Sequence, residues 1–162
     1  MLYLLDANVL ISAHNDYYPI DRIPQFWKWL TREGVAGHAK IPYEIYEEIT
    51  GKKDDLLAQW IAEEETRDVL MLDEEANMDI YNQVIDQAYA PDLNEAETRQ
   101  IGRDPFLVAY ALMGSERCVV TKEVRKPKSK RGNRKVPNAC EDFEVPWMTD
   151  FEFYRERDFR IE

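Results

Sequence analysis

The sequence lacks any apolar run long enough to cross a bilayer, which takes about 20 residues in a helix. The stretch at 107–113 is among its longest apolar runs, and it is far shorter than that. The first ten residues, MLYLLDANVL, have no basic stretch ahead of their apolar side chains and carry an acid at position 6. They do not resemble a secretory signal. The sequence therefore predicts a cytoplasmic protein without membrane spans.

Cysteine is scarce. Cys118 and Cys140 are the two cysteines of the 162-residue chain, too few for a disulfide framework and without the paired short spacing of a zinc site. We expect them to be reduced core thiols. Hydrophobic residues make up 44% of the chain and charged residues 33%, which is typical of a globular protein. The length predicts one domain, over residues 1–162.

Net positive charge is also missing. The formal charge is −11, whereas affinity for a phosphate backbone normally comes from lysine and arginine. The segment 122–135 is the exception, because it holds one acid, Glu123, and eight basic residues: Lys122, Arg125, Lys126, Lys128, Lys130, Arg131, Arg134 and Lys135. We call this segment the basic loop. Two interpretations stay open, contact with RNA or simple solvation, while the acidic remainder suits a metal site and a cationic partner.

Apolar periodicity predicts strands that alternate with helices. Short apolar runs favour strands at 2–5, 35–41, 69–72, 118–121 and 145–147. Helical spacing favours helices at 9–13, 22–33, 42–51, 54–61, 74–89, from 94 to a break at 104–105, 105–113 and 150–158. This alternation predicts an α/β fold, a three-layer α/β/α domain with a mainly parallel sheet of four to five strands. Ligands of such sheets bind at the carboxyl ends of the strands.

Two local signals mark the helix after residue 93. Asn94 and Glu97 have the spacing of a capping box, in which each side chain bonds the other residue's backbone. Pro105 disfavours helical geometry at Asp104, so we expect one helix to end there and a new one to begin. Asp104 is predicted to cap this new helix.

Four carboxylates come at equivalent ends of these elements: Asp6 after the first strand, Glu48 on the helix after the second, Asp104 at a helix start and Glu123 after a later strand. Brought together away from water they repel one another, and such a cluster persists only with raised pKa values or bound cations. Mg²⁺ and Mn²⁺ prefer oxygen ligands and commonly bind a few carboxylates plus substrate phosphate. The pattern therefore predicts metal-dependent phosphodiester hydrolysis.

The same residues resemble a known family. LLDANVLIS at 4–12, IPYEIYEEITG at 41–51, GRDPFLVAYAL at 102–112 and VVTKE at 119–123 resemble, in this order, the motifs of the PIN-domain nucleases. The resemblance implies a PIN-like, Rossmann-like fold in which Asp6, Glu48, Asp104 and Glu123 hold Mg²⁺ or Mn²⁺. It also implies that Asn8 and Thr121 position the first and last acids, with Ser12 as a supporting hydroxyl residue.

The sequence departs from the family pattern in three ways. Glu123 replaces the usual aspartate, and Glu44 is the fallback for the second acid. The extended basic loop and the following tail resemble a PIN subgroup found beside helix-turn-helix regulators, and Asp142 in that tail could supply another carboxylate. The resemblance implies an endoribonuclease that is the VapC-like toxin half of a toxin–antitoxin pair, with an RNA substrate, a DNA-binding antitoxin as partner and a homodimeric state.

Other interpretations compete with this one. Taken singly, Asp6 and Asp104 are ordinary helix caps, and Glu44, Glu47 and Glu48 form an ordinary solvated helix face. The chain could also be a catalytically silent PIN module that binds RNA or a protein partner. A phosphatase with an aspartate nucleophile would need a second aspartate two residues after Asp6, and Asn8 occupies that position.

Overall fold

The computed structural model describes residues 1–51 and 55–162. Within them, four parallel strands form one sheet in the order β2-β1-β3-β4. The strands are β1 (Leu2–Leu5), β2 (Ala39–Lys40), β3 (Arg117–Val120) and β4 (Trp147–Met148). Parallel neighbours need long crossover connections, and helices fill them. The predicted parallel sheet of four to five strands is confirmed.

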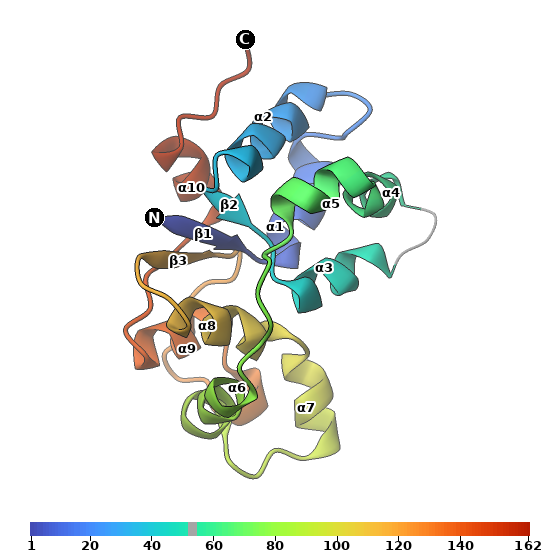
Figure 1. Ribbon diagram of the computed structural model, residues 1–162. Helices are drawn as coiled ribbons and strands as arrows, with labels where there is room; N and C mark the ends of the chain where they lie inside the picture. The colour runs from blue at the N-terminus through green and yellow to red at the C-terminus, as the bar shows by residue number, and fades with distance from the viewer. Residues whose placement is uncertain (52–54) are drawn as a thin grey trace.

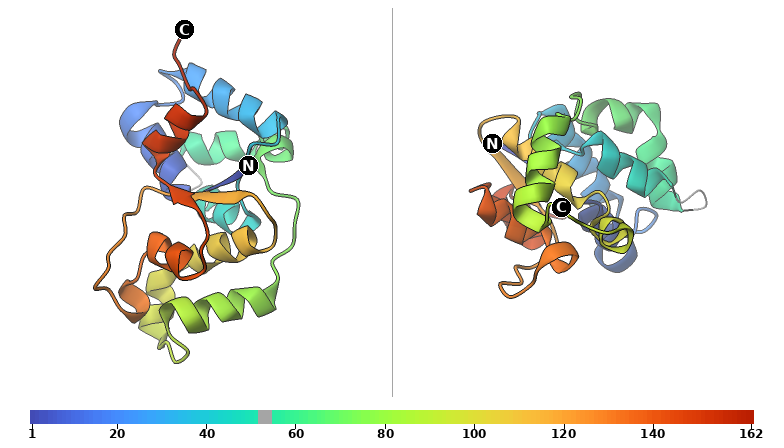
Figure 2. Two further views of the ribbon diagram at one scale, coloured as in Figure 1. Left: turned by 90° about the vertical axis from the view of Figure 1, so that its left-hand side faces the viewer. Right: turned by 90° about the horizontal axis from the view of Figure 1, so that it is seen from below.

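Helices cover both faces of this sheet. In Figures 1 and 2, α2 and α10 lie on one side of the strands and α8 and α9 on the other, which gives the predicted three layers. The helices are α1 (Ala7–Ser12), α2 (Pro24–Val35), α3 (Tyr43–Thr50), α4 (Leu56–Ala62), α5 (Glu64–Leu70), α6 (Met78–Val84), α7 (Glu95–Ile101), α8 (Asp104–Leu112), α9 (Val136–Asp142) and α10 (Asp150–Glu156). Shorter π and 3₁₀ segments are η1 (Ala13–Tyr17), η2 (Ile85–Tyr89) and η3 (Arg131–Asn133).

The two central strands are apolar because both of their faces are covered. Leu4, Leu5, Val119 and Val120 are fully buried, as expected for a parallel sheet between helical layers. They belong to a hydrophobic cluster that also contains the apolar faces of the surrounding helices. The sheet is thus a rigid platform whose carboxyl edge presents the residues that follow β1 and β3.

One predicted strand is wrong. Residues 69–72 end helix α5 and then form a single parallel bridge, between Met71 and Ile41. Thr66 and Leu70, four residues apart, are the buried positions of α5, so helical packing decides this segment. The predicted strand at 35–41 is likewise shorter, because α2 continues through Val35 and leaves β2 only Ala39–Lys40.

Several helix boundaries shift by a few residues. α4 begins at Leu56 with Asp55 as its cap, which accepts a hydrogen bond from the Leu57 N–H at 2.9 Å; Asp54, also predicted in this helix, lies outside the described residues. α6 begins at Met78 instead of residue 74, because the Asn77 side chain caps it. The segment continues as η2 to Tyr89, where the predicted helix also ends.

The break before α8 is confirmed, but its cap is different. The Asn94–Glu97 capping box starts α7, which ends before Gly102, a residue with a φ of 53°. Asp104 is the first residue of α8, the N-cap position belongs to Arg103, and no side chain caps the helix. The prediction that Asp104 caps α8 is therefore wrong, and its carboxylate is left for another role.

Both cysteines are buried and free, as predicted. In the part of the chain that the structure describes, every helix is too short or too polar to cross a membrane.

Candidate metal centre

Three carboxylates meet at the carboxyl edge of the sheet. Asp6 directly follows β1, Glu123 comes shortly after β3, and Asp104 opens α8. One carboxylate oxygen from each residue lies within 4.8 Å of the other two, and among the described residues this is the one group of acidic, histidine or cysteine side chains with such geometry. We call Asp6, Asp104 and Glu123 the acidic triad. This triad could hold a metal ion.

Asp6 is held from two sides by neutral side chains. The Thr121 hydroxyl donates a hydrogen bond to Oδ2 of Asp6 at 2.8 Å, and the amide of Asn8 donates to the same oxygen at 3.1 Å. Thr121 is fully buried and Asp6 is only 4% exposed. The carboxylate is therefore fixed in orientation by hydrogen bonds that supply no positive charge.

The same two residues fix the start of the basic loop. Asn8 accepts a hydrogen bond from the Lys122 N–H through Oδ1 at 3.0 Å, and the Thr121 hydroxyl accepts one from the Glu123 N–H at 3.1 Å. At the other end of the loop, the Val136 N–H donates to Oε2 of Glu123 at 2.8 Å. Asn8 and Thr121 thus link Asp6, the first acid, to the segment that carries Glu123, the last.

Helix capping does not explain the two aspartates of the triad. Asp6 occupies the N-cap position of α1, but its side chain makes no capping hydrogen bond. Within the described part of the chain, no group donates a hydrogen bond to the carboxylate of Asp104. A partly buried carboxylate without a donor is costly, because it has given up part of its hydration without a hydrogen bond in exchange.

Burial and mutual repulsion raise the pKa of both aspartates. Burial is the largest cause for Asp6, and together with the charges of Glu123 and Glu48 it raises the pKa of Asp6 to about 7, against the hydrogen bond from Thr121. For Asp104, burial and then the charges of Asp6, Glu123 and Glu48 raise the pKa to about 9, and Lys135 acts in the opposite direction. The triad is a site where negative charge is unfavourable unless a cation is present.

Glu48, on α3, lies within electrostatic range of the triad. Its charge raises the pKa of both Asp6 and Asp104. Glu44, the alternative second acid, accepts hydrogen bonds from the Tyr110 hydroxyl at 2.7 and 3.1 Å, and Glu47 pairs with Arg103 at 3.3 Å. The charge of Glu48 thus acts on both aspartates of the triad, while Glu44 and Glu47 contact Tyr110 and Arg103.

Two other predicted residues lie apart from the triad. Oδ2 of Asp142 pairs with Nη1 of Arg134 at 2.6 Å, at the end of α9. Ser12 is the last residue of α1, and among the described residues its hydroxyl makes no hydrogen bond to any of the acids. The structure brings together Asp6, Asp104 and Glu123, with Asn8 and Thr121 behind them and Glu48 nearby.

The basic loop divides into paired and unpaired cations. Arg131 pairs with Asp92 at 2.7 Å and with Glu97 at 2.8 Å, while Arg125 pairs with Glu141 and Lys122 with Asp150. These contacts, and that of Arg134, fasten the loop to acidic residues elsewhere. Over residues 1–51 and 55–162, the cations of the loop without an ion pair are Lys126, Lys128, Lys130 and Lys135.

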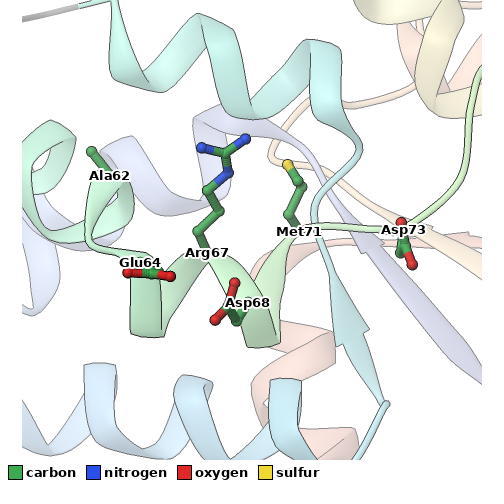
Figure 3. A pocket seen from close by; sticks show the side chains of 6 residues that line it. All are labelled: Ala62, Glu64, Arg67, Asp68, Met71 and Asp73. Atoms are coloured by element: carbon green, nitrogen blue, oxygen red, sulfur yellow. The ribbon is translucent and has the colours of Figure 1, made fainter.

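A hollow lies elsewhere, beside α5. It has a volume of about 680 Å³, and Figure 3 shows Arg67 and Met71 pointing from this region toward α3. Its lining is Ala62, Glu64, Arg67, Asp68, Met71 and Asp73, so none of the predicted site residues takes part. Its acids do not converge as those of the triad do. The hollow beside α5 is therefore separate from the candidate metal centre.

The donor set of the triad fits a hard divalent cation. It offers carboxylate oxygens only, and one of them, on Asp104, has no hydrogen-bond donor among the described residues. Oxygen-rich sites suit Mg²⁺, Mn²⁺ or Ca²⁺, whereas zinc sites are usually built from cysteine and histidine.

Comparisons with known proteins give a family but no activity. Residues 3–161 match the model of a family described as "Domain of unknown function (DUF4411)", and since the match spans nearly the whole chain, the protein belongs to this family. No curated protein and no solved structure matches the chain.

Proposed function

We propose that this member of the DUF4411 family is a cytoplasmic, Mg²⁺- or Mn²⁺-dependent endoribonuclease that hydrolyses RNA phosphodiester bonds. We further propose that it is the toxin component of a bacterial toxin–antitoxin pair, restrained by a DNA-binding antitoxin. The observation that carries the proposal is the convergence of Asp6, Asp104 and Glu123 within 4.8 Å; in the described chain none of the three forms an ion pair, and Asp104 has no hydrogen-bond donor.

The order of the residues along the chain also supports this function. Asp6, Glu48, Asp104 and Glu123 come in the order in which the PIN-domain nucleases present their acids, and Asn8 and Thr121 stand beside the first and last of them. The parallel sheet puts this set at the edge where α/β proteins bind their ligands. The resemblance of the motifs and the geometry of the centre therefore lead to the same chemistry.

Each residue of the centre has a definable task. Asp6, Asp104 and Glu123 would ligate the cation and Glu48 would complete its environment, while Thr121 and Asn8 keep Asp6 in place. A bound Mg²⁺ or Mn²⁺ ion supplies the Lewis-acid chemistry of hydrolysis, lowering the pKa of water and neutralising phosphate charge. The unpaired lysines of the basic loop would attract the phosphate backbone of the substrate.

Cleavage of a generic single-stranded RNA tests the proposal. The wild-type protein should cut the RNA in Mn²⁺ and leave it intact in EDTA, and Asp6→Asn should abolish cleavage without unfolding the protein. Asp142→Asn is the matched control, because Asp142 is another acid of similar size that pairs with Arg134 outside the triad. This control should cut as the wild type does.

Two results would contradict the proposal. Wild-type protein that binds RNA but never cuts it in Mn²⁺ would indicate the silent module instead. Cleavage that survives Asp6→Asn would indicate a contaminating nuclease or a different centre. The toxin role has its own readout: expression of the wild type, but not of Asp6→Asn, should arrest bacterial growth.

A further inference from the structure

Three tyrosine hydroxyls are buried without a partner. Among the side chains that the structure describes, Tyr46, Tyr89 and Tyr154 each bury a hydroxyl oxygen that makes no hydrogen bond. A buried hydroxyl without a partner destabilises a folded protein, and natural structures contain few of them. Each one needs a reason, and the surroundings of Tyr89 suggest one.

Tyr89 belongs to η2, a segment that contacts α9 and η3 and directly follows α6. It is the last residue of η2 and is 6% exposed. The carbonyl of the preceding residue, Ala88, accepts a hydrogen bond from Arg134 at 2.7 Å. Two residues after Arg134, the Val136 N–H donates a hydrogen bond to the Glu123 carboxylate. Helix α6 directly precedes η2. It packs against α8, whose first residue is Asp104.

The electrostatics of Tyr89 agree with this position. Burial is the largest cause that raises the pKa of its hydroxyl well above the usual value, and the negative charges of Asp104 and Glu123 come next. With its pKa raised in this way, the O–H of Tyr89 is a neutral hydrogen-bond donor at any physiological pH.

Donor and acceptor are complementary here. The Tyr89 hydroxyl has no acceptor, and the carboxylate of Asp104 has no donor in residues 1–51 and 55–162. Glu123, by contrast, already accepts the Val136 N–H, and Asp6 is held by Thr121 and Asn8. Asp104 is the one acid of the triad that still needs an orienting neighbour.

We propose that Tyr89 is a positioning residue of the metal centre, whose hydroxyl donates a hydrogen bond to the Asp104 carboxylate when a divalent cation draws the triad together. The inference rests on the proposed cation site. It explains why an unpartnered hydroxyl is kept beside the triad, and it assigns a role to a residue outside all the motifs that predicted the centre. Partners of this kind orient metal ligands, and losing one typically weakens metal binding 10- to 100-fold.

Two matched tyrosine-to-phenylalanine variants test this inference. Tyr89→Phe removes only the buried, unpartnered hydroxyl. Tyr154→Phe removes another buried and unpartnered hydroxyl, on α10. The Tyr154 ring packs beside Phe26, Phe153 and Phe159, and α10 lies on the opposite side of the sheet from α8 (Figure 1). Mn²⁺ affinity is measured by titration calorimetry, and stability by thermal denaturation in EDTA.

The two variants should have similar stability without metal but different affinities for Mn²⁺. In EDTA neither should melt below the wild type, because each has lost an unsatisfied polar group. In Mn²⁺ titrations Tyr154→Phe should match the wild type, whereas Tyr89→Phe should bind 10- to 100-fold more weakly. A hydroxyl with a merely structural role would produce no such difference.

The outcomes separate this inference from the proposed function. If the wild type binds Mn²⁺ and Tyr89→Phe binds it equally well, the role of Tyr89 is refuted and the metal centre stands. Equal weakening by both variants refutes it too, since the effect would then not depend on the triad. A wild type that binds no Mn²⁺ overturns the cation site itself and this inference with it.

Discussion

Replacing Asp6 by asparagine should make the metal-free protein more stable above neutral pH. Asparagine has nearly the shape of a protonated aspartate, and its oxygen can still accept the hydrogen bond from Thr121. It carries no charge at any pH. The variant therefore removes the repulsion from Glu123 and Glu48 and the cost of burying a carboxylate, the causes that raise the pKa of Asp6.

The sign and the size follow from the pKa of Asp6. Its pKa rises from 3.8 to about 7 on folding, so between these values the folded protein binds more protons than the unfolded chain, and the free energy of unfolding falls as the pH rises. A shift of about three units corresponds to about 4 kcal/mol, lost between pH 4 and pH 7. Because Asp6 is 4% exposed, solvent screens little of this effect.

Urea denaturation in EDTA at several pH values from 5 to 9 measures the effect. The difference between Asp6→Asn and wild type should grow from about 2 kcal/mol at pH 5 to about 4 kcal/mol above pH 8, where it corresponds to roughly 10 °C in Tm. Asp142→Asn, which breaks the pair with Arg134, should show no such rise with pH. A difference that does not change with pH would refute the reasoning, since it would mean that Asp6 is not a destabilised carboxylate.

Three further predictions concern the hydroxyl behind the centre, the basic loop and the packing of two helices. Thr121→Val leaves Asp6, Asn8 and the Glu123 N–H without their shared hydroxyl, so Mn²⁺ affinity by calorimetry should fall about 10- to 100-fold; unchanged affinity would contradict the supporting role. Replacing Lys126, Lys128 and Lys130 by alanine should weaken RNA binding and flatten its dependence on salt, measured by fluorescence anisotropy, while Mn²⁺ affinity stays as it is. An unchanged salt slope would show that the loop is merely solvated. Gly34→Ala should lower the free energy of unfolding, measured in urea, by about 1–3 kcal/mol, because a Cβ there would come within 2.7 Å of Leu70 and 2.8 Å of the Val69 carbonyl oxygen. In the control Gly51→Ala, the atom nearest to the new Cβ is 3.6 Å away. Equal stability of the two variants would contradict the close approach of α2 and α5.

The sequence predicts most of the fold because its strongest signals are local. Alternation of short apolar runs with helical periodicity specifies the parallel sheet and its layers, and the Asn94–Glu97 box and Pro105 mark helix ends through backbone chemistry that does not depend on the rest of the fold. The segment at 69–72 shows the limit. A four-residue apolar run fits a strand as well as the end of a helix, and packing of Thr66 and Leu70 decides between them.

The candidate site is predictable where its residues follow strands. Asp6 and Glu123 come after β1 and β3, and neighbouring parallel strands bring such residues together without further information. Asp104 is different, because its availability as a ligand depends on its not capping α8. Only the structure shows that Arg103 takes the N-cap position and leaves the Asp104 carboxylate without a donor in the described residues.

Tyr89 lies beyond what this sequence could predict, for a physical reason. Near the end of an amphipathic helix, a tyrosine that faces the core and one that faces a polar centre follow the same apolar spacing. What distinguishes them is the position of one oxygen atom, and at Tyr89 the π-helical turn of η2 alters the register that helical spacing assumes. Tyr154 satisfies the same spacing and buries the same orphan hydroxyl among aromatic rings, away from the triad. A residue that orients a metal ligand can therefore look, in the sequence, identical to one that only fills the core, and the comparison of Tyr89→Phe with Tyr154→Phe isolates that difference.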